Sequence, residues 1–91
     1  MQFLRLEGMP KLNELSPKIT HSPRKVLATN VVKFRAALGY SQDELALEAG
    51  LHRTFVTHVE RCARNISLDN VERLAIALQV QVHELLTPVE P

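Results

Sequence analysis

Apolar residues recur at helical spacing along most of the chain. After residue 25 they fall at i, i+4, i+7 and i+11, at Leu27, Val31, Phe34 and Leu38. A second stripe follows Ser67 at i, i+3, i+6, i+7 and i+10, formed by Leu68, Val71, Leu74, Ala75 and Leu78. The spacing predicts one helix that ends at Gly39 and another that is capped by Ser67.

The region between these stripes predicts two shorter helices joined by a tight turn. The letters SQDE at 41–44 fit a capping box, in which the Ser41 hydroxyl accepts from the Glu44 amide and the Glu44 carboxylate reaches back. That helix ends at Gly50, which can take the positive φ of a tight turn. At 100° per residue, the next helix, 52–61, turns Leu51, Phe55, Val56 and Val59 to one side and Arg53, Thr54, Thr57 and His58 to the other.

Composition agrees with an all-α fold. Only 4% of the 91 residues are aromatic and none is Trp, so the core must consist of Leu, Val, Ile and Ala. With a short helix at about 82–86, the pattern predicts a compact five-helix bundle over residues 25–87 and a tail at 88–91. Residues 1–24 contain three prolines and no sustained helical period, which is typical of an extension.

Charge and chemistry narrow the function. The net charge is only +1, but residues 51–66 carry three Arg against one Glu. Cys62 is the only cysteine, which excludes an internal disulfide and CxxC zinc pairs and favours a cytoplasmic setting. The sequence lacks an apolar membrane segment, a carboxylate pair in a plausible cleft, a nucleophile elbow and a Gly-rich phosphate loop. We expect neither an enzyme nor a bound metal or cofactor.

A short capped helix, a glycine turn and a second helix with a polar outer face make the helix-turn-helix pattern. Residues 27–87 resemble the Cro and phage-repressor type, the XRE family, which includes restriction-modification controller proteins. The resemblance lies in the segments LGYSQDELALEAGL, HRTFVTHVER, RNISLDNVERLAIALQV and VHELL. It implies a lambda-repressor-like DNA-binding bundle.

The resemblance also implies roles for individual residues. The base-reading positions hold His52, Arg53, Thr54 and His58, whose groups suit guanine, the thymine methyl and purine N7. The expected contacts to the DNA backbone come from Gln42, Thr57, Arg61, Arg64 and Asn65. An internal ion pair is expected between Arg35 and Glu60, with the role of orienting the reading helix.

Two positions depart from the family pattern, because Cys62 and Gln79 stand where Gly is usual. Each must adopt a left-handed backbone or shift the helix cap, at a cost of about 1 kcal/mol. Cys62 is interpreted as a partly buried thiol, with redox sensing as an alternative. Zinc binding by His58 and Cys62 is disfavoured, because two ligands do not make a site.

Two function classes remain. The first is a transcription regulator that binds double-stranded DNA as a homodimer, because a two-fold dimer reads half-sites about one DNA turn apart. Its expected dimer face consists of Val80, Val82, Leu85 and Leu86. The second is an antitoxin-type interaction module that binds a partner protein through residues 1–24. Within that extension, the letters SPRK at 22–25 are predicted to be a plain linker, with a minor-groove arm as the alternative.

Overall fold

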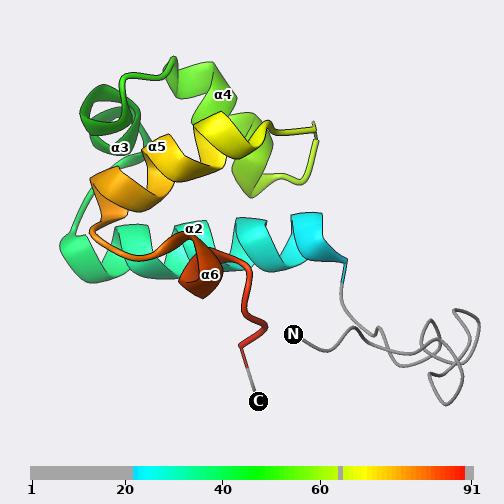
Figure 1. Ribbon diagram of the computed structural model, residues 1–91. Coiled ribbons are helices and arrows are strands. Elements are labelled where there is room, and N and C mark those ends of the chain that lie inside the picture. Colours follow the sequence, from blue (N-terminus) through cyan, green and yellow to red (C-terminus); the bar gives the residue numbers. More distant parts are fainter. Residues whose placement is uncertain (1–21, 64, 90–91) are drawn as a thin grey trace, which may run out of the picture.

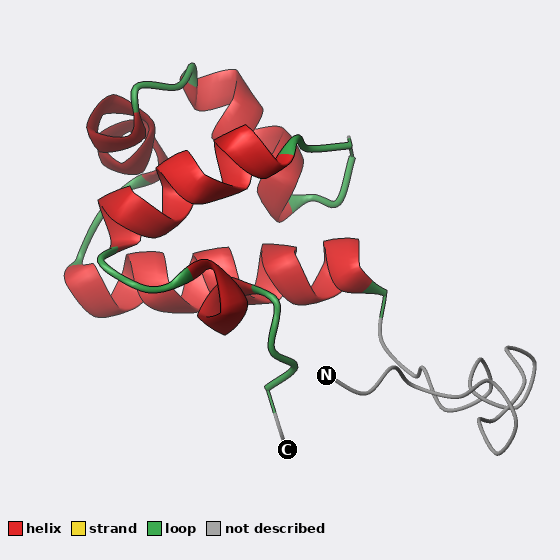
Figure 2. Cartoon of the chain, viewed as in Figure 1, coloured by secondary structure: helices red, strands yellow, loops and turns green. Residues whose placement is uncertain are grey.

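The computed structural model describes residues 22–63 and 65–89, which form five α-helices and no strand (Figures 1 and 2). The prediction of an all-α, five-helix bundle is confirmed. The helices are α2 (Pro23–Leu38), α3 (Gln42–Ala49), α4 (Arg53–Glu60), α5 (Leu68–Leu78) and α6 (Val82–Leu85). Residues 1–21, most of the predicted extension, lie outside the described residues.

The core is built by all five helices, with α2 packed against α4 and α5. The short α6 packs on α2 and α5, while α3 packs on α4 and α5 (Figure 1). The largest completely buried apolar side chains come from all five helices and are Val31, Leu45, Val56, Leu74 and Leu85. These are residues of the predicted apolar stripes together with Leu45 and Leu85 on the shorter helices, so burial of one face of each helix explains the fold.

The first helix begins earlier than the sequence pattern predicts. Pro23 occupies its first turn, where a missing N–H costs nothing because that group has no intrahelical partner. Arg24 and Lys25 continue the same helix. The interpretation of 22–25 as a plain linker is therefore wrong, because residues 23–25 are helical. The alternative, an arm that reaches a minor groove, stays a prediction.

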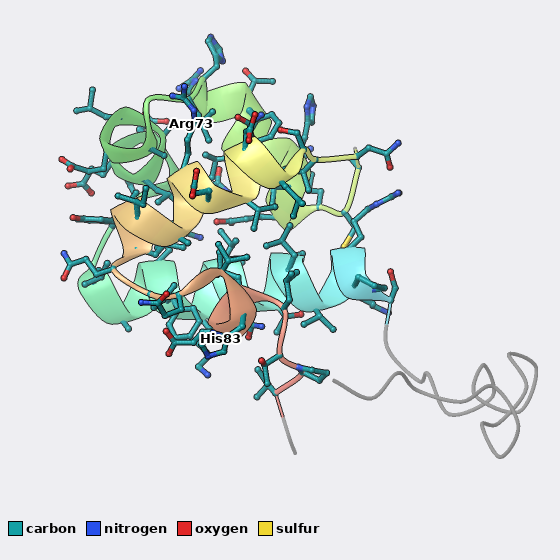
Figure 3. The ribbon with its side chains drawn as sticks, viewed as in Figure 1. Arg73 and His83 are labelled. Carbon is teal, nitrogen blue, oxygen red and sulfur yellow. The ribbon has the colours of Figure 1, made fainter. Side chains whose placement is uncertain are left out.

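Caps fix the ends of α3. Ser41 Oγ accepts from the Glu44 amide at 3.0 Å, and Glu44 Oε1 accepts from the Ser41 amide at 2.8 Å. These hydrogen bonds hold the pKa of Glu44 below its ordinary value, because they stabilise its charged form. At the other end Gly50 has φ +68°, and a Cβ there would lie 3.3 Å from Nη1 of Arg73, which reaches toward this turn from α5 (Figure 3).

Cys62 and Gln79 adopt left-handed backbones, with φ of 58° and 62°. After α4, the amides of Cys62 and Ala63 bond back to Val59 O and His58 O at 3.0 and 2.9 Å, which is a Schellman-type ending. Gln79 ends α5 in the same way through its own amide and that of Val80. The helix ends therefore keep the geometry usual for glycine, and the side chains bear the steric cost.

Asn30 connects α2 to the C-terminal segment. Its side chain is 1% exposed, and its Nδ2 donates to Leu85 O at 2.9 Å and Thr87 O at 2.8 Å, with Glu84 O at 3.3 Å. These carbonyls end α6 and would otherwise lack partners. A single buried amide thus holds a helix of only four residues in place.

Replacing Gln79 with glycine is expected to stabilise the fold by about 0.5–1 kcal/mol. Relief of the left-handed strain, about 1–2 kcal/mol, exceeds the extra chain entropy that glycine loses on folding, about 0.5–1 kcal/mol. Urea denaturation measures the change. Gln79→Ala is the matched control, since alanine keeps the Cβ and should give no gain; equal stability of the two variants would contradict the strain argument.

Candidate nucleic-acid interface

Helices α3 and α4, joined by the turn at Gly50, form a helix-turn-helix unit. The inner face of α4 is anchored by Val56 and Val59, which are 0% and 3% exposed. Its outer face carries the polar side chains expected from the sequence: His52, Arg53 and Thr54 are exposed, and Thr57 and His58 are half-buried. The first three cluster at the N-terminal end of α4, the end that enters a major groove in this motif.

His52 caps α4. Its Nδ1 accepts from the Thr54 amide at 3.1 Å, so in the neutral imidazole the proton is carried by Nε2. The cap therefore leaves one ring N–H as a donor on an exposed side chain. Purine N7 and O6 in the major groove accept such a bond.

Arg53 is the first residue of α4, and its side chain is 70% exposed. Its Nη1 lies 3.7 Å from Oδ2 of Asp43, the second residue of α3, which is 66% exposed. The contact is an ion pair across the two helices of the motif. Spacing along the chain does not reveal this pair, because the contact is tertiary.

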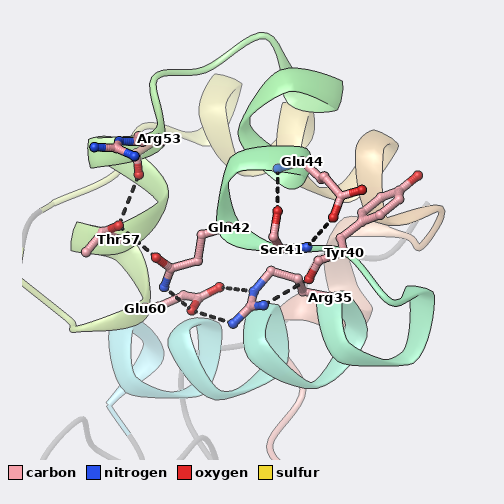
Figure 4. A network of polar contacts seen from close by, with 8 residues as sticks. All are labelled: Arg35, Tyr40, Ser41, Gln42, Glu44, Arg53, Thr57 and Glu60. Carbon is pink, nitrogen blue, oxygen red and sulfur yellow. Dashed lines mark hydrogen bonds and ion pairs between the residues drawn. The ribbon is translucent and has the colours of Figure 1, made fainter.

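A polar network holds α4 against α2 and α3 (Figure 4). Arg35 Nε and Nη2 donate to the two carboxylate oxygens of Glu60 at 2.6 and 3.0 Å, and Arg35 Nη1 donates to Tyr40 O at 2.9 Å. Gln42 Nε2 donates to Glu60 Oε1 at 2.8 Å, and Thr57 Oγ1 donates to Gln42 Oε1 at 3.0 Å. The side chains of Arg35 and Glu60 are 19% and 6% exposed.

The network limits what Gln42 and Thr57 can offer to DNA. The Gln42 amide has two N–H groups and uses one on Glu60, so one remains for a phosphate. The single Thr57 proton is directed at Gln42 Oε1 or at Arg53 O, 3.2 Å away. Since a phosphate only accepts, a Thr57–phosphate bond requires that internal bond to break. This link between α3 and α4 is tertiary and is not visible in the spacing of the sequence.

The loop after α4 holds further candidate residues. Arg61 and Asn65 are exposed, and Asn65 Oδ1 accepts from the Arg24 guanidinium of α2. Cys62 is half-buried with its Sγ 3.8 Å from Arg24 O. Arg64 lies outside the described residues. Arg24, predicted from the sequence to belong to the extension, is therefore a cation beside this loop.

The predicted dimer face needs one correction. Leu85 is 0% exposed and belongs to the core, so its assignment to a dimer face is wrong. Val80 and Val82 are half-buried and pack against the same core, and Leu86 is 40% exposed. The four residues of α6 make a single turn. Leu85, its last residue, faces the core, and Leu86 is the C-cap.

A hollow of about 400 Å³ lies beside Leu86. Its apolar lining includes Leu27, Ile66 and Val71, and Leu68 stands at its edge with 74% exposure. The hollow extends from the N-terminal ends of α2 and α5 to the end of α6. It is an apolar surface adjacent to the loop that follows α4.

In residues 22–63 and 65–89, no three His, Cys, Asp or Glu residues gather as a metal site would require. None of the helices in these two ranges has the length and apolar character needed to cross a bilayer.

Comparison with known proteins identifies this arrangement. A family model described as helix-turn-helix matches residues 31–85. A hypothetical transcription factor of Neisseria meningitidis is 51% identical over 65 residues, 71% of this chain and 61% of that protein. Control protein C.BamHI of Bacillus amyloliquefaciens is 52% identical over 46 residues, 50% of this chain and 57% of that protein. The matches thus span about three fifths of the length of these two relatives.

Solved structures agree. The crystal structure of the restriction-modification controller protein C.AhdI from Aeromonas hydrophila gives a TM-score of 0.67 at 38% identity, over 71% of this chain and 98% of the other. These matches confirm the resemblance to the XRE type and its controller proteins that the sequence motifs indicated.

A double-mutant cycle on Arg35 and Glu60 is expected to give a coupling free energy of about 1–3 kcal/mol in urea unfolding. Removing either partner leaves the other charge poorly solvated, so the single alanine variants should each lose stability and the double variant less than their sum. The exposed Asp43–Arg53 pair is the matched control, expected below about 0.5 kcal/mol. A coupling near zero for Arg35 and Glu60 would show that the network does not hold α4.

Proposed function

The chain belongs to the helix-turn-helix family of DNA-binding transcription regulators, and we propose that it binds a palindromic operator as a homodimer through α4. The observation that carries the proposal is the set of exposed polar side chains at the start of α4, on a helix whose orientation is held by Glu60. A helix fixed in this way can present its side chains to base edges in one register.

Base reading is assigned to His52, Arg53, Thr54 and His58. The guanidinium of Arg53 suits guanine O6 and N7, and the Nε2–H of His52 suits a purine acceptor. Thr54 can contact a thymine methyl group. His52, Arg53 and Thr54 form the reading surface. His58 is half-buried one turn further along α4, so its contact lies at the edge of that surface.

Contacts to the DNA backbone are assigned around this surface. The N-terminal amides of α3 and the remaining N–H of Gln42 suit one phosphate, because a helix N-terminus favours an anion. Arg61, Arg64 and Asn65 suit another from the loop after α4. Arg24 holds Asn65 by its Oδ1, which leaves the Asn65 amide N–H groups as donors. Thr57 contributes only if it releases Gln42.

A homodimer is supported by geometry and by exposed apolar surface. One α4 reads about half an operator, and two-fold symmetry lets two copies address half-sites about one turn apart. The proposed dimer face is Leu86 with Leu68 and the hollow between them. Val80 and Val82 do not line this hollow and pack against the core instead. This face borders the loop after α4, so dimerisation would fix the distance between the two reading helices.

The alternative function, capture of a partner protein by residues 1–24, gains no support. The matched relatives are named as a transcription factor and control proteins. Residues 22–24, the described part of that segment, belong to the cap and first turn of α2. Control of transcription is therefore the function proposed for the chain.

Selection from a random double-stranded DNA pool is expected to recover a palindrome with the native chain. Arg53→Ala should relax the preference at one base pair in each half-site, since one bidentate contact contributes about 1–3 kcal/mol of discrimination. Both proteins must be compared at one salt concentration, because phosphate contacts make affinity salt-dependent. If the native chain enriches no motif, α4 is not a sequence reader.

Leu68→Ser and Leu86→Ser are each expected to weaken dimerisation by about tenfold or more, because burying a leucine contributes about 1.5–3 kcal/mol. Sedimentation equilibrium measures the dimer constant, and circular dichroism checks folding. Leu47→Ser, on α3, is the matched control because Leu47 is 79% exposed and lies outside the proposed face. Dimerisation that is weakened equally by all three substitutions would contradict this choice of surface.

A further inference from the structure

Asp43 is an acid at a place where a polyanion is expected to bind. It is the second residue of α3, next to Gln42, and the proposed function puts a phosphate at this helix end. A carboxylate here repels phosphates unless a cation compensates it. The compensating cation is Arg53, with Nη1 at 3.7 Å from Oδ2.

The pair contributes little to the stability of the fold. Both side chains are about two thirds exposed, and such ion pairs contribute little to stability. Neither side chain belongs to the network around Glu60, whose members are Arg35, Gln42 and Thr57. The pair therefore matters through its effect on the Arg53 guanidinium at the reading surface.

The geometry of the guanidinium determines which N–H groups of Arg53 are left for a base. Its five N–H groups lie in one plane, and the Nε and Nη2 groups form one edge with two parallel donors. Asp43 Oδ2 lies 3.7 Å from Nη1, at ion-pair distance, and no partner of the Nε–Nη2 edge is found among the residues that the structure describes. Arg35 uses the same edge on Glu60, at 2.6 and 3.0 Å. In Arg53 the edge is available for guanine O6 and N7.

We propose that Asp43 is a specificity-determining residue that acts through Arg53. On the operator it holds the guanidinium by Nη1 while the Nε–Nη2 edge binds guanine. On other DNA, Arg53 finds no bidentate acceptor and turns to a phosphate, and the Asp43 charge is left uncompensated beside the backbone. Asp43 thus favours the guanine-containing site and penalises all others. This inference rests on the proposed function, because it requires that α4 reads bases.

The test compares Asp43→Asn with the native chain on three duplexes at one salt concentration. These are the operator recovered by selection, the same operator with the guanine read by Arg53 changed to adenine in both half-sites, and an unrelated duplex of equal length. Asp43→Asn is expected to bind the unrelated duplex more tightly. The ratio of its affinities for the first two duplexes should fall by about fivefold or more, the lower limit of what one bidentate contact discriminates.

Two controls separate a specific role from a loss of negative charge. Glu48→Gln removes another exposed acid of α3, for which no ion pair is found among the described residues, and it should leave the affinity ratio unchanged. In the background of Arg53→Ala, Asp43→Asn should cause no further fall in the ratio, because its effect passes through that guanidinium. Circular dichroism checks that each variant is folded.

The outcomes distinguish this inference from the proposed function. If Asp43→Asn tightens binding to all three duplexes by the same factor, Asp43 is only an electrostatic barrier and the inference is wrong, while α4 is still the reader. An affinity ratio that falls equally in Glu48→Gln overturns it as well. If the native chain itself does not distinguish the operator from the unrelated duplex, the proposed function fails, and the inference fails with it.

Discussion

The hydrogen bonds that the Glu60 carboxylate accepts are the interaction on which the rest of the interface depends. This carboxylate stands at the last residue of α4 and accepts from Arg35 of α2 and Gln42 of α3, so one side chain connects three helices. With 6% exposure it is nearly cut off from water, where an unpaired charge would be costly. Each donor is therefore needed, and the direction of α4 follows from where those donors lie.

This arrangement explains how so short a helix can give its outer face to recognition. Eight residues are too few for a helix to persist alone in water. In α4, the His52 cap secures the first turn, the burial of Val56 and Val59 secures the middle, and Glu60 secures the last turn. Stability comes from the cap, the inner face and the end, so His52 Nε2, Arg53 and Thr54 remain available for DNA.

The sequence predicted what is periodic and local. The apolar stripes located α2 and α5 because burying one helix face repeats every three or four residues, and the capping box at Ser41 located the start of α3. It could not distinguish the buried Leu85 from the exposed Leu86, because four residues are too short to show a period. The partners of Gln42, Thr57 and Asp43 depend on the packing of α3 against α4, which spacing along the chain does not encode.

The ion pairs also explain why a net charge of +1 is a poor guide to this interface. Glu60, the one acid between residues 51 and 66, is compensated internally by Arg35, so it does not weaken the attraction of a phosphate to Arg61. Asp43 is compensated by Arg53. The electrostatic potential at the outer face of α4 therefore depends on which acids already have a basic partner. The net charge of the chain does not contain this information, because it counts every acid as if it faced the DNA.

The two ion pairs also differ in exposure. Because the Asp43 pair is exposed, DNA can compete for its arginine, whereas the buried Glu60 pair is protected from that competition. The Asp43–Arg53 pair can therefore respond to the DNA sequence, while the Arg35–Glu60 pair keeps α4 in place.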